Sequence, residues 1–329
     1  MRQELKSLKE ITQPIFEDIK LFEQEFRNAL RSEVRLINLV GKYIIRHKGK
    51  HIRPVLTILA SRVCSQPTIN SYRAAAMIEL LHLATLIHDD VVDGAMKRRG
   101  WFSINRIWGN KLAVLMGDFV LSKSLIYMIK LKDFDILDLI SKTAELMSSG
   151  EILQLDYRYK KRPSEKIYFN LIRQKTASLI ATGCKLGALT TSKSKQDCKF
   201  MSSYGYNLGM AYQIRDDLFD LLGNESYTGK DKGIDVKKNT LTLPIIHSIQ
   251  SLSKSESRSL LKLVKMKQKT KDALTEIMQL VKKGNGFDYA QEKIDHYTQS
   301  AIESLSPYPD SIYKNSMINL ARFNRTRVH

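Results

Sequence analysis

The sequence predicts an all-α protein, on three observations. Proline is scarce, because Pro67 is followed next by Pro163 and then by Pro244. The proline-free stretches are rich in Ala, Leu, Met and Ile and dotted with Lys and Glu, and their apolar residues recur at helical spacing. Strand-like alternation between turn signals is hard to find anywhere in the chain. We therefore expect long helices along almost the whole sequence.

Turn-forming clusters divide the chain into these helices. The expected breaks are at residues 65–70, 94–103, 160–165, 190–196, 223–233 and 306–310. No low-complexity linker separates two halves, and each half contributes one acidic helix end. One domain over residues 1–329 is therefore more economical than two, with only a hint of internal pseudo-symmetry.

Composition limits the partners and the compartment. The 329 residues are 43% hydrophobic and carry a formal net charge of +19, which suggests an anionic partner, although the lysines are scattered as on an ordinary solvated surface. The three cysteines form no CxxC pair, so neither a disulfide framework nor a zinc site is indicated. The start of the chain is charged and has no apolar segment of the kind that a signal peptide needs, and no apolar run is long enough to span a membrane. We expect a soluble cytoplasmic protein.

Two acidic motifs follow strongly apolar runs, "LIHDDVVD" at 86–93 and "QIRDDLFD" at 213–220. Their aspartates are Asp89, Asp90, Asp93, Asp216, Asp217 and Asp220. Helix residues four apart project together, so the first and last aspartate of each motif share a face. Like charges this close raise one another's pKa and destabilise the site unless a cation intervenes. Carboxylates suit Mg²⁺, which typically bridges them to phosphates, so metal sites are favoured over two solvated helix ends.

Basic residues follow each acidic motif and also occur in two other segments. They are Lys50 and Arg53 in "GKHIRP", Arg98 and Arg99 in "KRRG", Lys175 in "KTASL" and Lys230 in "GKDKG". Arg and Lys hold diphosphate oxygens by charge-assisted hydrogen bonds. Any one of them could be an ordinary surface charge, but their recurrence after the acidic motifs favours metal-bridged diphosphate chemistry.

In these residues the sequence resembles the trans-isoprenyl diphosphate synthases, the polyprenyl synthetase family, and in particular its long-chain type. The landmarks run in order from about residue 40 to residue 247. They are "GKHIRP", "HDDVVDGAMKRRG", "KTASL", "YQIRDDLFD" and "GKDKGIDVKKNTLTLP". The resemblance implies a single-domain class I isoprenoid synthase fold, a helical bundle around a central cavity, usually in a homodimer.

The resemblance also implies a reaction, in which isopentenyl diphosphate attacks an allylic cation formed by Mg²⁺-assisted loss of diphosphate. Three Mg²⁺ ions, replaceable by Mn²⁺, are expected on the six aspartates, with Asp220 bound through water. Isopentenyl diphosphate is expected on Lys50, Arg53, His82 and Arg99. The allylic diphosphate is expected on Arg98, Lys175 and Lys230. The residues expected to act in catalysis are Asp89, Asp90, Lys175, Thr176, Gln213 and Asp216.

Two further residues are candidates for the site, and the first of them has an alternative interpretation. His82 lies two helical turns before Asp89, where a lone His on an apolar helix is often a satisfied core residue, yet its position matches the isopentenyl diphosphate pocket of the family. Arg325, in the terminal "FNRTRVH", resembles the basic end that some members fold over the active site.

Three positions depart from the family pattern. Lys48 replaces the first Gly of the Gly-Gly-Lys motif, and His51 stands where Lys or Arg is common. Thr240 occupies the place of the second lysine in the "DVKKNTLTLP" signature. One contact to the allylic diphosphate is then missing, or Lys237 or Lys238 supplies it.

Product length is expected to be measured along the helix that carries Asp89. One turn rises about 5.4 Å, close to one isoprene unit. Short-chain members place an aromatic residue four or five positions before the motif, where this chain has Thr85 and Ala84, with Leu81 next. No plug is evident at that depth, so we expect a hexaprenyl to nonaprenyl product.

Alternatives remain for product length and for class. Ala84 and Thr85 could merely permit helix packing, with Tyr127 or Met128 of residues 113–129 forming the floor of the tunnel. A farnesyl or geranylgeranyl diphosphate synthase and a non-catalytic length-determining subunit of a heteromeric synthase stay open. A class I terpene cyclase would lack the second Asp-rich motif, and a nucleic-acid binder would not explain six carboxylates. We expect no nucleic acid, but include a peripheral membrane contact for product release.

Overall fold

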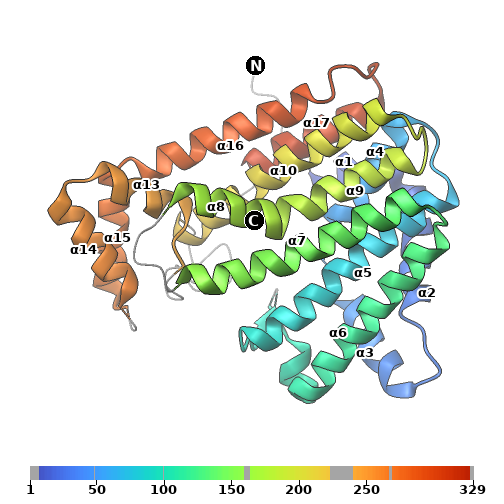
Figure 1. The fold of residues 1–329 in the computed structure, drawn as a ribbon, viewed down its shortest axis with the longest axis horizontal. Helices are drawn as coiled ribbons and strands as arrows, with labels where there is room; N and C mark the ends of the chain where they lie inside the picture. The colour runs from blue at the N-terminus through green and yellow to red at the C-terminus, as the bar shows by residue number, and fades with distance from the viewer. Residues whose placement is uncertain are drawn as a thin grey trace. The chain divides into compact units, whose positions relative to one another are not determined.

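The computed structural model describes residues 7–47, 49–98, 100–158, 164–222, 240–266 and 269–326. Helices account for most of them (Figure 1). The strands among the described residues are β1 (Lys97–Arg98) and β2 (Trp101–Phe102), which pair as an antiparallel hairpin. The prediction of an all-α fold is confirmed, and the hairpin lies inside the break expected at 94–103.

The chain divides into two compact units. Unit 1 comprises Met1–Ala144, Leu179–Gly205 and Ser304–Asn319, and unit 2 comprises Glu145–Ser178, Tyr206–Glu303 and Leu320–His329. The helices α7 (Phe134–Arg158), α10 (Lys195–Leu222) and α17 (Ile312–Thr326) contribute residues to both units. The expectation of one domain over residues 1–329 stays a prediction.

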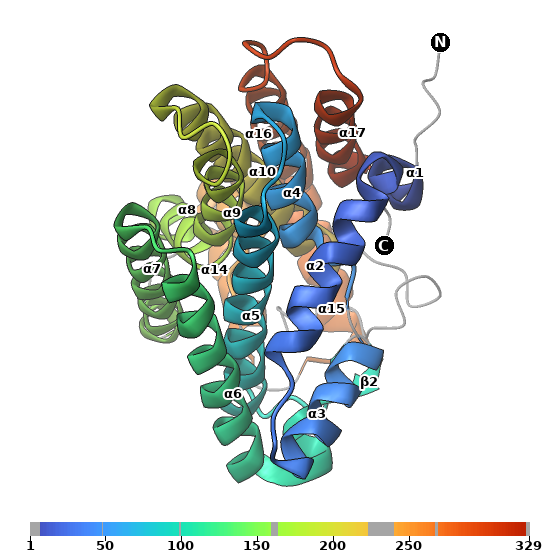
Figure 2. The same ribbon diagram turned by 90° about the vertical axis from the view of Figure 1, so that its right-hand side faces the viewer.

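Unit 1 is built on a pair of long helices, α5 (Ile69–Val92) and α6 (Ile104–Lys130), which lie side by side (Figure 1). The helices α2 (Phe16–Ala29) and α4 (Ile52–Cys64) pack on α5 (Figure 2). The remaining elements are α1 (Leu8–Thr12), a 3₁₀ turn at Gln13–Ile15, α3 (Arg35–Arg46) and most of α9 (Ser178–Leu189). This packing buries α5 along most of its length.

The residues of α5 explain why it forms and where it ends. At its start the Ser71 hydroxyl accepts a hydrogen bond from the backbone N–H of Thr68 at 3.1 Å. Fully buried side chains such as Met77 and Leu80 each contribute about 1.5–3 kcal/mol by leaving water. The helix stops before Gly94, whose φ of 60° is a left-handed conformation that terminates helices. The acidic motif therefore sits in the last turn of a buried helix.

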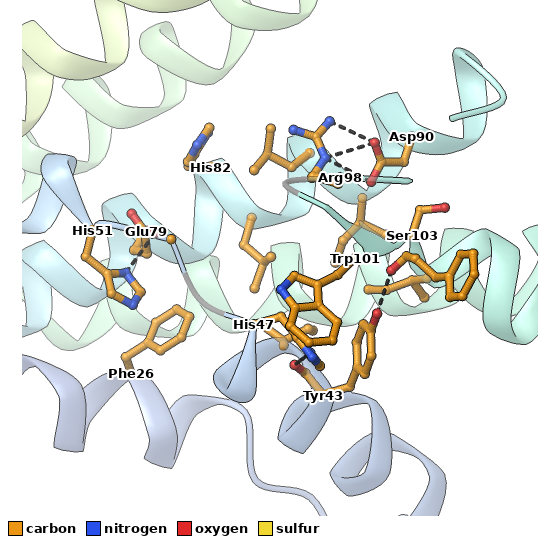
Figure 3. Close-up of a pocket in the computed structure, with 17 residues that line it drawn as sticks. Phe26, Tyr43, His47, His51, Glu79, His82, Asp90, Arg98, Trp101 and Ser103 are labelled. Carbon is orange, nitrogen blue, oxygen red and sulfur yellow. Dashed lines mark hydrogen bonds and ion pairs between the residues drawn. The ribbon is translucent and has the colours of Figure 1, made fainter. Parts of the chain in front are cut away.

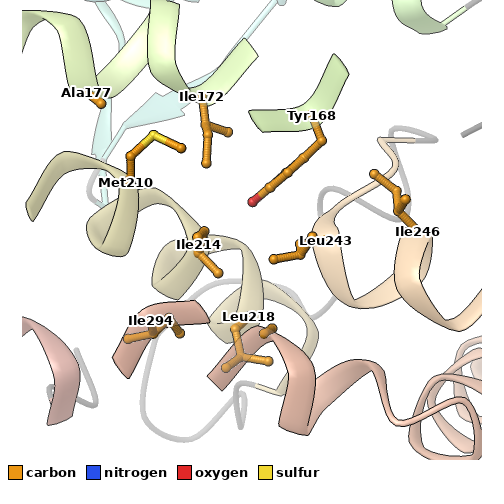
Figure 4. Packing of buried hydrophobic residues seen from close by; sticks show 10 residues of the cluster. Tyr168, Ile172, Ala177, Met210, Ile214, Leu218, Leu243, Ile246 and Ile294 are labelled. Carbon is orange, nitrogen blue, oxygen red and sulfur yellow. The ribbon is translucent and has the colours of Figure 1, made fainter. Parts of the chain in front are cut away.

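Unit 2 contains α8 (Glu165–Ile172), a π-helical turn (Arg173–Ala177), α13 (Leu243–Ser251), α14 (Lys254–Lys265), α15 (Lys271–Lys283) and α16 (Gly286–Glu303). Its core gathers Tyr168, Ile172, Ile214, Leu218, Leu243 and Ile294 from four helices (Figure 4). The start of α16 lies so close to α13 that a Cβ on Gly286 would come within 2.2 Å of the Pro244 carbonyl oxygen. This core fixes the part of α10 that carries the second acidic motif.

Several helix ends follow the turn signals of the sequence. The structure has the expected breaks at four places. They lie between α4 and α5, between α5 and α6, between α9 and α10, and before α17. The expected breaks at 160–165 and 223–233 lie largely or wholly outside the described residues. The helix expected over 113–129 ends within one residue of the end of α6, but the turn after it was not among the expected breaks, because Lys132 adopts a left-handed φ of 52° where neither Gly nor Pro marks a turn. Among the described helices, α6 is long and apolar enough to cross a membrane, but this is a weak indication because a core helix passes the same test.

Candidate active site

The first acidic motif ends α5, and its three aspartates differ in exposure. Asp90 is only 7% exposed, whereas Asp89 is half-buried and Asp93 is exposed. The Arg98 guanidinium donates from Nε to the Asp90 carboxylate at 2.9 Å and from its terminal nitrogen at 2.8 Å. The β1–β2 hairpin thus folds back on the motif, and two residues predicted to bind metal and diphosphate are paired with each other.

The turn between α5 and the hairpin is held by side chains from the start of α6. Asn105 donates its amide N–H groups to the carbonyl oxygens of Asp90 at 3.3 Å and Ala95 at 3.1 Å. The Ser103 hydroxyl donates to the Ala95 carbonyl at 2.6 Å. These bonds satisfy the carbonyls that a helix leaves open at its C-terminus, and they fix the direction of the hairpin.

Beside the motif lies a cavity of about 110 Å³ (Figure 3). Its polar lining includes His51, Glu79, His82, Asp90 and Arg98, and its apolar lining comes mainly from α5 and the hairpin. The cavity therefore brings together three residues predicted to bind substrate or metal, namely His82, Asp90 and Arg98.

His82 is half-buried on α5, with its Nε2 2.9 Å from a terminal nitrogen of Arg53. A guanidinium only donates hydrogen bonds, so His82 accepts at Nε2 and carries its proton on Nδ1. His82 is thus a partner of the predicted Arg53 rather than an isolated core residue. Its role in substrate binding stays a prediction.

The loop that carries Lys50 is anchored by its neighbour His51. His51 has a left-handed φ of 47°, and its Nδ1 lies 2.9 Å from a Glu79 carboxylate oxygen. The rings of Phe22 and Phe26 pack against it in T-shaped geometry, with centroids 5.3 and 5.6 Å away. The replacement of the family's Lys or Arg by His51 is therefore accommodated by a defined partner, while Lys50 itself is exposed.

The second acidic motif repeats the arrangement of the first within unit 2. Asp217 is 7% exposed and accepts hydrogen bonds from the Tyr168 hydroxyl at 2.6 Å and the Gln213 amide at 2.8 Å. Asp216 and Asp220 are half-buried. In both motifs the middle aspartate is anchored by donors of its own unit, and the two outer aspartates are the more accessible ones.

A hydrogen-bond chain joins Asp217 to the "KTASL" segment. Thr176 donates its hydroxyl to the Gln213 side-chain oxygen at 2.7 Å, and the amide N–H of Gln213 continues to Asp217. The carboxylate only accepts, so the direction of each bond in this chain is determined. The structure thus brings together two predicted catalytic residues, Thr176 and Gln213.

Lys175 lies beside Thr176 in the π-helical turn and contacts a different helix. Its Nζ donates to the Gln154 side-chain oxygen at 2.6 Å and to a Glu151 carboxylate oxygen at 2.7 Å, both on α7. Single π turns are common at functional sites because the extra residue changes the direction of neighbouring side chains. Lys175 is therefore held in place by α7. A diphosphate that bound Lys175 would have to displace the Glu151 carboxylate.

The outer aspartates fit a divalent cation that also binds phosphate. Mg²⁺ typically takes one or two carboxylates and completes its shell with water and substrate oxygens. Each motif offers two outer carboxylates four residues apart, which is the number of protein ligands that Mg²⁺ typically takes. Among the residues that the structure describes, no cluster of three His, Cys, Asp or Glu side chains forms a closed metal site.

The residues expected to set product length lie along α5. Leu81 and Ala84 are 4% and 1% exposed, and Thr85 is half-buried with its hydroxyl on the His82 carbonyl at 2.8 Å. Tyr127, a candidate floor of the tunnel, is buried and donates its hydroxyl to the Glu25 carbonyl at 2.8 Å. Their role in product length stays a prediction.

Several predicted residues lie outside the described part of the chain. These are Lys48, Arg99, Lys230, Lys237 and Lys238. Thr240 lies just before α13 and is half-buried. Arg325, the candidate for closing the site, binds both carboxylate oxygens of Asp295 within unit 2, at 2.7 and 2.8 Å.

Sequence reasoning missed the side chains that hold the predicted ones. They are Glu79, Asn105, Glu151, Gln154 and Tyr168. None lies at a motif spacing, and each comes from a different part of the chain than its partner. Only Asn105, close after the first motif, had a signal in the sequence, since an Asn at a helix start often binds nearby backbone.

Comparisons with known proteins agree with this geometry. The sequence pattern of the polyprenyl synthetase family matches residues 34–281. The octaprenyl diphosphate synthase of Haemophilus influenzae is 30% identical over 320 residues, which cover 97% of each chain. Component 2 of the heptaprenyl diphosphate synthase of Bacillus subtilis is 31% identical over 308 residues, covering 93% of this chain and 87% of that one.

A solved structure shows the same fold. The polyprenyl synthase of Caulobacter crescentus, complexed with calcium and isoprenyl diphosphate, superposes with a TM-score of 0.91 at 26% identity, covering 99% of this chain and all of the other. The all-α architecture, the two anchored acidic motifs and the sequence match agree. This chain belongs to the polyprenyl synthetase family and is a prenyltransferase.

Proposed function

We propose that this chain condenses isopentenyl diphosphate onto an allylic diphosphate and makes a trans polyprenyl diphosphate of hexaprenyl to nonaprenyl length. The observation that carries the proposal is the repeated acidic motif, with a middle aspartate anchored in each unit and two more accessible outer aspartates. The relatives named octaprenyl and heptaprenyl diphosphate synthase support the length range.

The outer aspartates would hold Mg²⁺, with Asp89 and Asp93 from the first motif and Asp216 and Asp220 from the second. When bound, the metal supplies Lewis-acid stabilisation of the departing diphosphate. The calcium in the Caulobacter crescentus polyprenyl synthase complex supports divalent-cation use. Asp90 is bound by Arg98, and Asp217 is bound by Tyr168. These two aspartates would position the outer carboxylates, or would bind metal themselves after releasing those partners.

The basic residues would bind the two diphosphates by charge-assisted hydrogen bonds. Lys50, Arg53 and His82 would take isopentenyl diphosphate, together with Arg99. Arg98 and Lys175 would take the allylic diphosphate, together with Lys230. Because Arg98 and Lys175 already bind carboxylates, the arriving phosphate oxygens would replace one anionic partner by another.

The allylic carbon–oxygen bond breaks, and both electrons leave with diphosphate. The double bond of isopentenyl diphosphate attacks the resulting cation and forms the new carbon–carbon bond, and the departing diphosphate takes the proton that is lost. The Thr176 and Gln213 oxygens would face the developing positive charge with their dipoles, held by their mutual hydrogen bond.

We also propose that the chain forms a homodimer through α6. One face of this helix exposes Val114, Leu115, Leu125, Ile126 and Ile129, at helical spacing. An apolar stripe of this kind is unfavourable in water and typical of a subunit interface. The name of the Bacillus subtilis relative, a component 2, makes a heteromer with a second chain the alternative.

Incubation with labelled isopentenyl diphosphate, Mg²⁺ and primers of several lengths, followed by product sizing, tests the proposal. The expected products are hexaprenyl to nonaprenyl diphosphate, and Asp89→Ala should abolish Mg²⁺-dependent condensation. The exposed Asp138, paired with Lys142 on the surface of α7, provides the control Asp138→Ala, which should retain full turnover.

Each other outcome identifies an alternative. Products of farnesyl or geranylgeranyl length would assign the chain to the short-chain members. A homodimer without turnover would favour the length-determining subunit of a heteromer. Turnover retained by Asp89→Ala would remove the metal role of the first motif.

A further inference from the structure

We propose that unit 1 docks on an anionic lipid membrane through α3 and the β1–β2 hairpin, here called the docking face. It consists of Arg35, Leu36, Leu39, Lys42 and Arg46 of α3, Arg27 and Arg31 beside it, and Trp101 and Phe102 of the hairpin. The inference goes beyond the proposed reaction, because no residue of α3 is assigned to catalysis or substrate binding.

The outward side of α3 is both cationic and apolar. Arg35, Leu39, Lys42 and Arg46 recur every three or four residues and are all exposed, so they form one stripe along the helix. Leu39 is 53% exposed, and Leu36, at the edge of the stripe, is 43% exposed. A helix that needs only water on its outer side would carry polar residues at these positions.

One flank of the stripe is a basic hollow. A cavity of about 620 Å³ is lined by four cations, Arg27, Arg31, Lys42 and Arg46, and by no acidic residue. Arg27 is paired with Glu23 at 3.4 Å, but within the described chain no ion pair joins the other three to an acidic side chain. Glu33, just before α3, is an exposed acid close to the stripe. The hollow therefore fits anionic groups.

The other flank carries exposed aromatic rings. Trp101 and Phe102 are 56% and 52% exposed, and they also line the cavity beside the first acidic motif. The hairpin is attached to α3, because the Tyr43 hydroxyl donates to the Phe102 carbonyl at 2.6 Å and the rings of His47 and Trp101 lie 4.1 Å apart. Since Tyr43 and His47 lie next to the outward stripe around the helix, the rings border the leucines and cations.

This combination selects a lipid surface over other anionic partners. Interfacial helices place leucines and aromatic rings at the level of the acyl boundary, while Lys and Arg bind anionic headgroups. Nucleic acid would use the cations but would leave Leu36 and Leu39 without a role. A second copy of the chain would bring cation against cation. A membrane would receive a long isoprenoid product directly, and this last point alone rests on the proposed function.

Vesicle co-sedimentation of the full chain tests the proposal. The chain should bind phosphatidylcholine vesicles that contain phosphatidylglycerol and should not bind phosphatidylcholine alone. Arg35→Glu with Lys42→Glu should lower the partition coefficient at least about tenfold, since each cation near an anionic surface contributes about fivefold. Failure of the unmodified chain to bind the anionic vesicles would overturn the proposal.

Helix α14 provides a control of equal charge. Lys254, Arg258, Lys262 and Lys265 form an exposed cationic stripe without exposed leucines. Arg258→Glu with Lys262→Glu should leave binding nearly unchanged. Equal losses in the two pairs would show that binding follows net charge alone, and would overturn the assignment to α3.

The apolar half of the face needs its own variant. Leu36→Ser with Leu39→Ser keeps every charge and should weaken binding, with far-UV circular dichroism confirming the fold. Unchanged binding would overturn insertion of the leucines, and a change in sedimentation velocity from dimer to monomer would make the face a contact between copies instead. Turnover of a short water-soluble primer should be unaffected in all these variants, so failure of condensation and failure of docking are read separately.

Discussion

The Tyr168 hydroxyl lies 2.6 Å from a carboxylate oxygen of Asp217, and it is the donor because the carboxylate can only accept. The bond joins α8 to α10 inside the core of unit 2. Asp217 is only 7% exposed, so it depends on this donor and on Gln213 for stabilisation of its charge. The second acidic motif is therefore supported by a residue far from it in sequence.

Tyr168→Phe removes this donor and leaves the ring in place. We expect the affinity for Mg²⁺, measured through turnover, to fall about 10- to 100-fold, as for other residues that orient metal ligands. The free energy of unfolding should fall by about 1–3 kcal/mol. Tyr204→Phe is the matched control, because its buried hydroxyl donates to the Met317 carbonyl at 2.8 Å in unit 1. An equal change in Mg²⁺ dependence in both variants would contradict the role of Tyr168.

Thr85→Phe should shorten the products towards farnesyl or geranylgeranyl length, because a ring one turn before Asp89 would block the growing chain. Product chromatography measures this directly. Thr85→Val is the control, since it loses the bond to the His82 carbonyl without adding bulk. Ala84→Phe should have the same effect with a larger loss of stability, because Ala84 is 1% exposed. An unchanged distribution of product lengths in both phenylalanine variants would refute the expectation that product length is measured along α5.

Gly187→Ala should destabilise unit 1. A Cβ there would lie 2.5 Å from the Thr57 carbonyl oxygen and 2.7 Å from the Ala60 Cβ, and neither atom can swing aside as the end of a flexible side chain could. The forced shift of α9 against α4 should cost about 1–3 kcal/mol, more than the gain in helix propensity. In Gly41→Ala the new Cβ meets nothing closer than 3.4 Å, so chemical denaturation should show no loss of stability. Equal stability of Gly187→Ala and the unmodified chain would contradict the close approach of the two helices.

The thiols should resist alkylation in the folded protein. Burial raises the pKa of Cys64 to about 12, and burial also raises the pKa of Cys198. A folded pKa above the unfolded value means that the neutral thiol stabilises the fold below about pH 8.5 and that this stabilisation is lost as the pH rises towards 12. Mass spectrometry after iodoacetamide treatment near pH 8 should find both thiols unlabelled, and labelled once guanidinium unfolds the chain. Rapid labelling of the native Cys64 would contradict the burial.

The helical fold and the acidic motifs could be predicted because they are written in local patterns. Spacing of apolar residues gave the long helices, and i, i+4 geometry placed Asp89 with Asp93 and Asp216 with Asp220. The hairpin at 97–102 was not predicted, because two residues per strand are too few for an alternating pattern to appear. The turn at Lys132 was not predicted for a different reason, because neither Gly nor Pro marks it.

What the sequence could not show is which partner satisfies each buried charge. In the sequence, Asp90 and Asp217 cannot be told from the neighbouring aspartates. In the structure each is buried, and each accepts a hydrogen bond from a residue that helical spacing does not predict as its partner. Arg98 lies eight residues from Asp90, and Tyr168 lies 49 residues from Asp217. Only tertiary packing decides such pairs, and packing also separates the anchoring aspartate of each motif from the two that are more accessible.

The π-helical turn at 173–177 gives this site an unusual sensitivity to chain length. It contains one residue more than an α-helical turn, and the adjacent Lys175 and Thr176 consequently contact different helices, α7 and α10. Deletion of one residue would leave a continuous helix with every backbone bond made, but would turn these side chains by about 100° relative to Tyr168. We therefore expect a relative with an alignment gap at this point to keep the fold but to lose this placement of Lys175 and Thr176, even where all the signature residues are present.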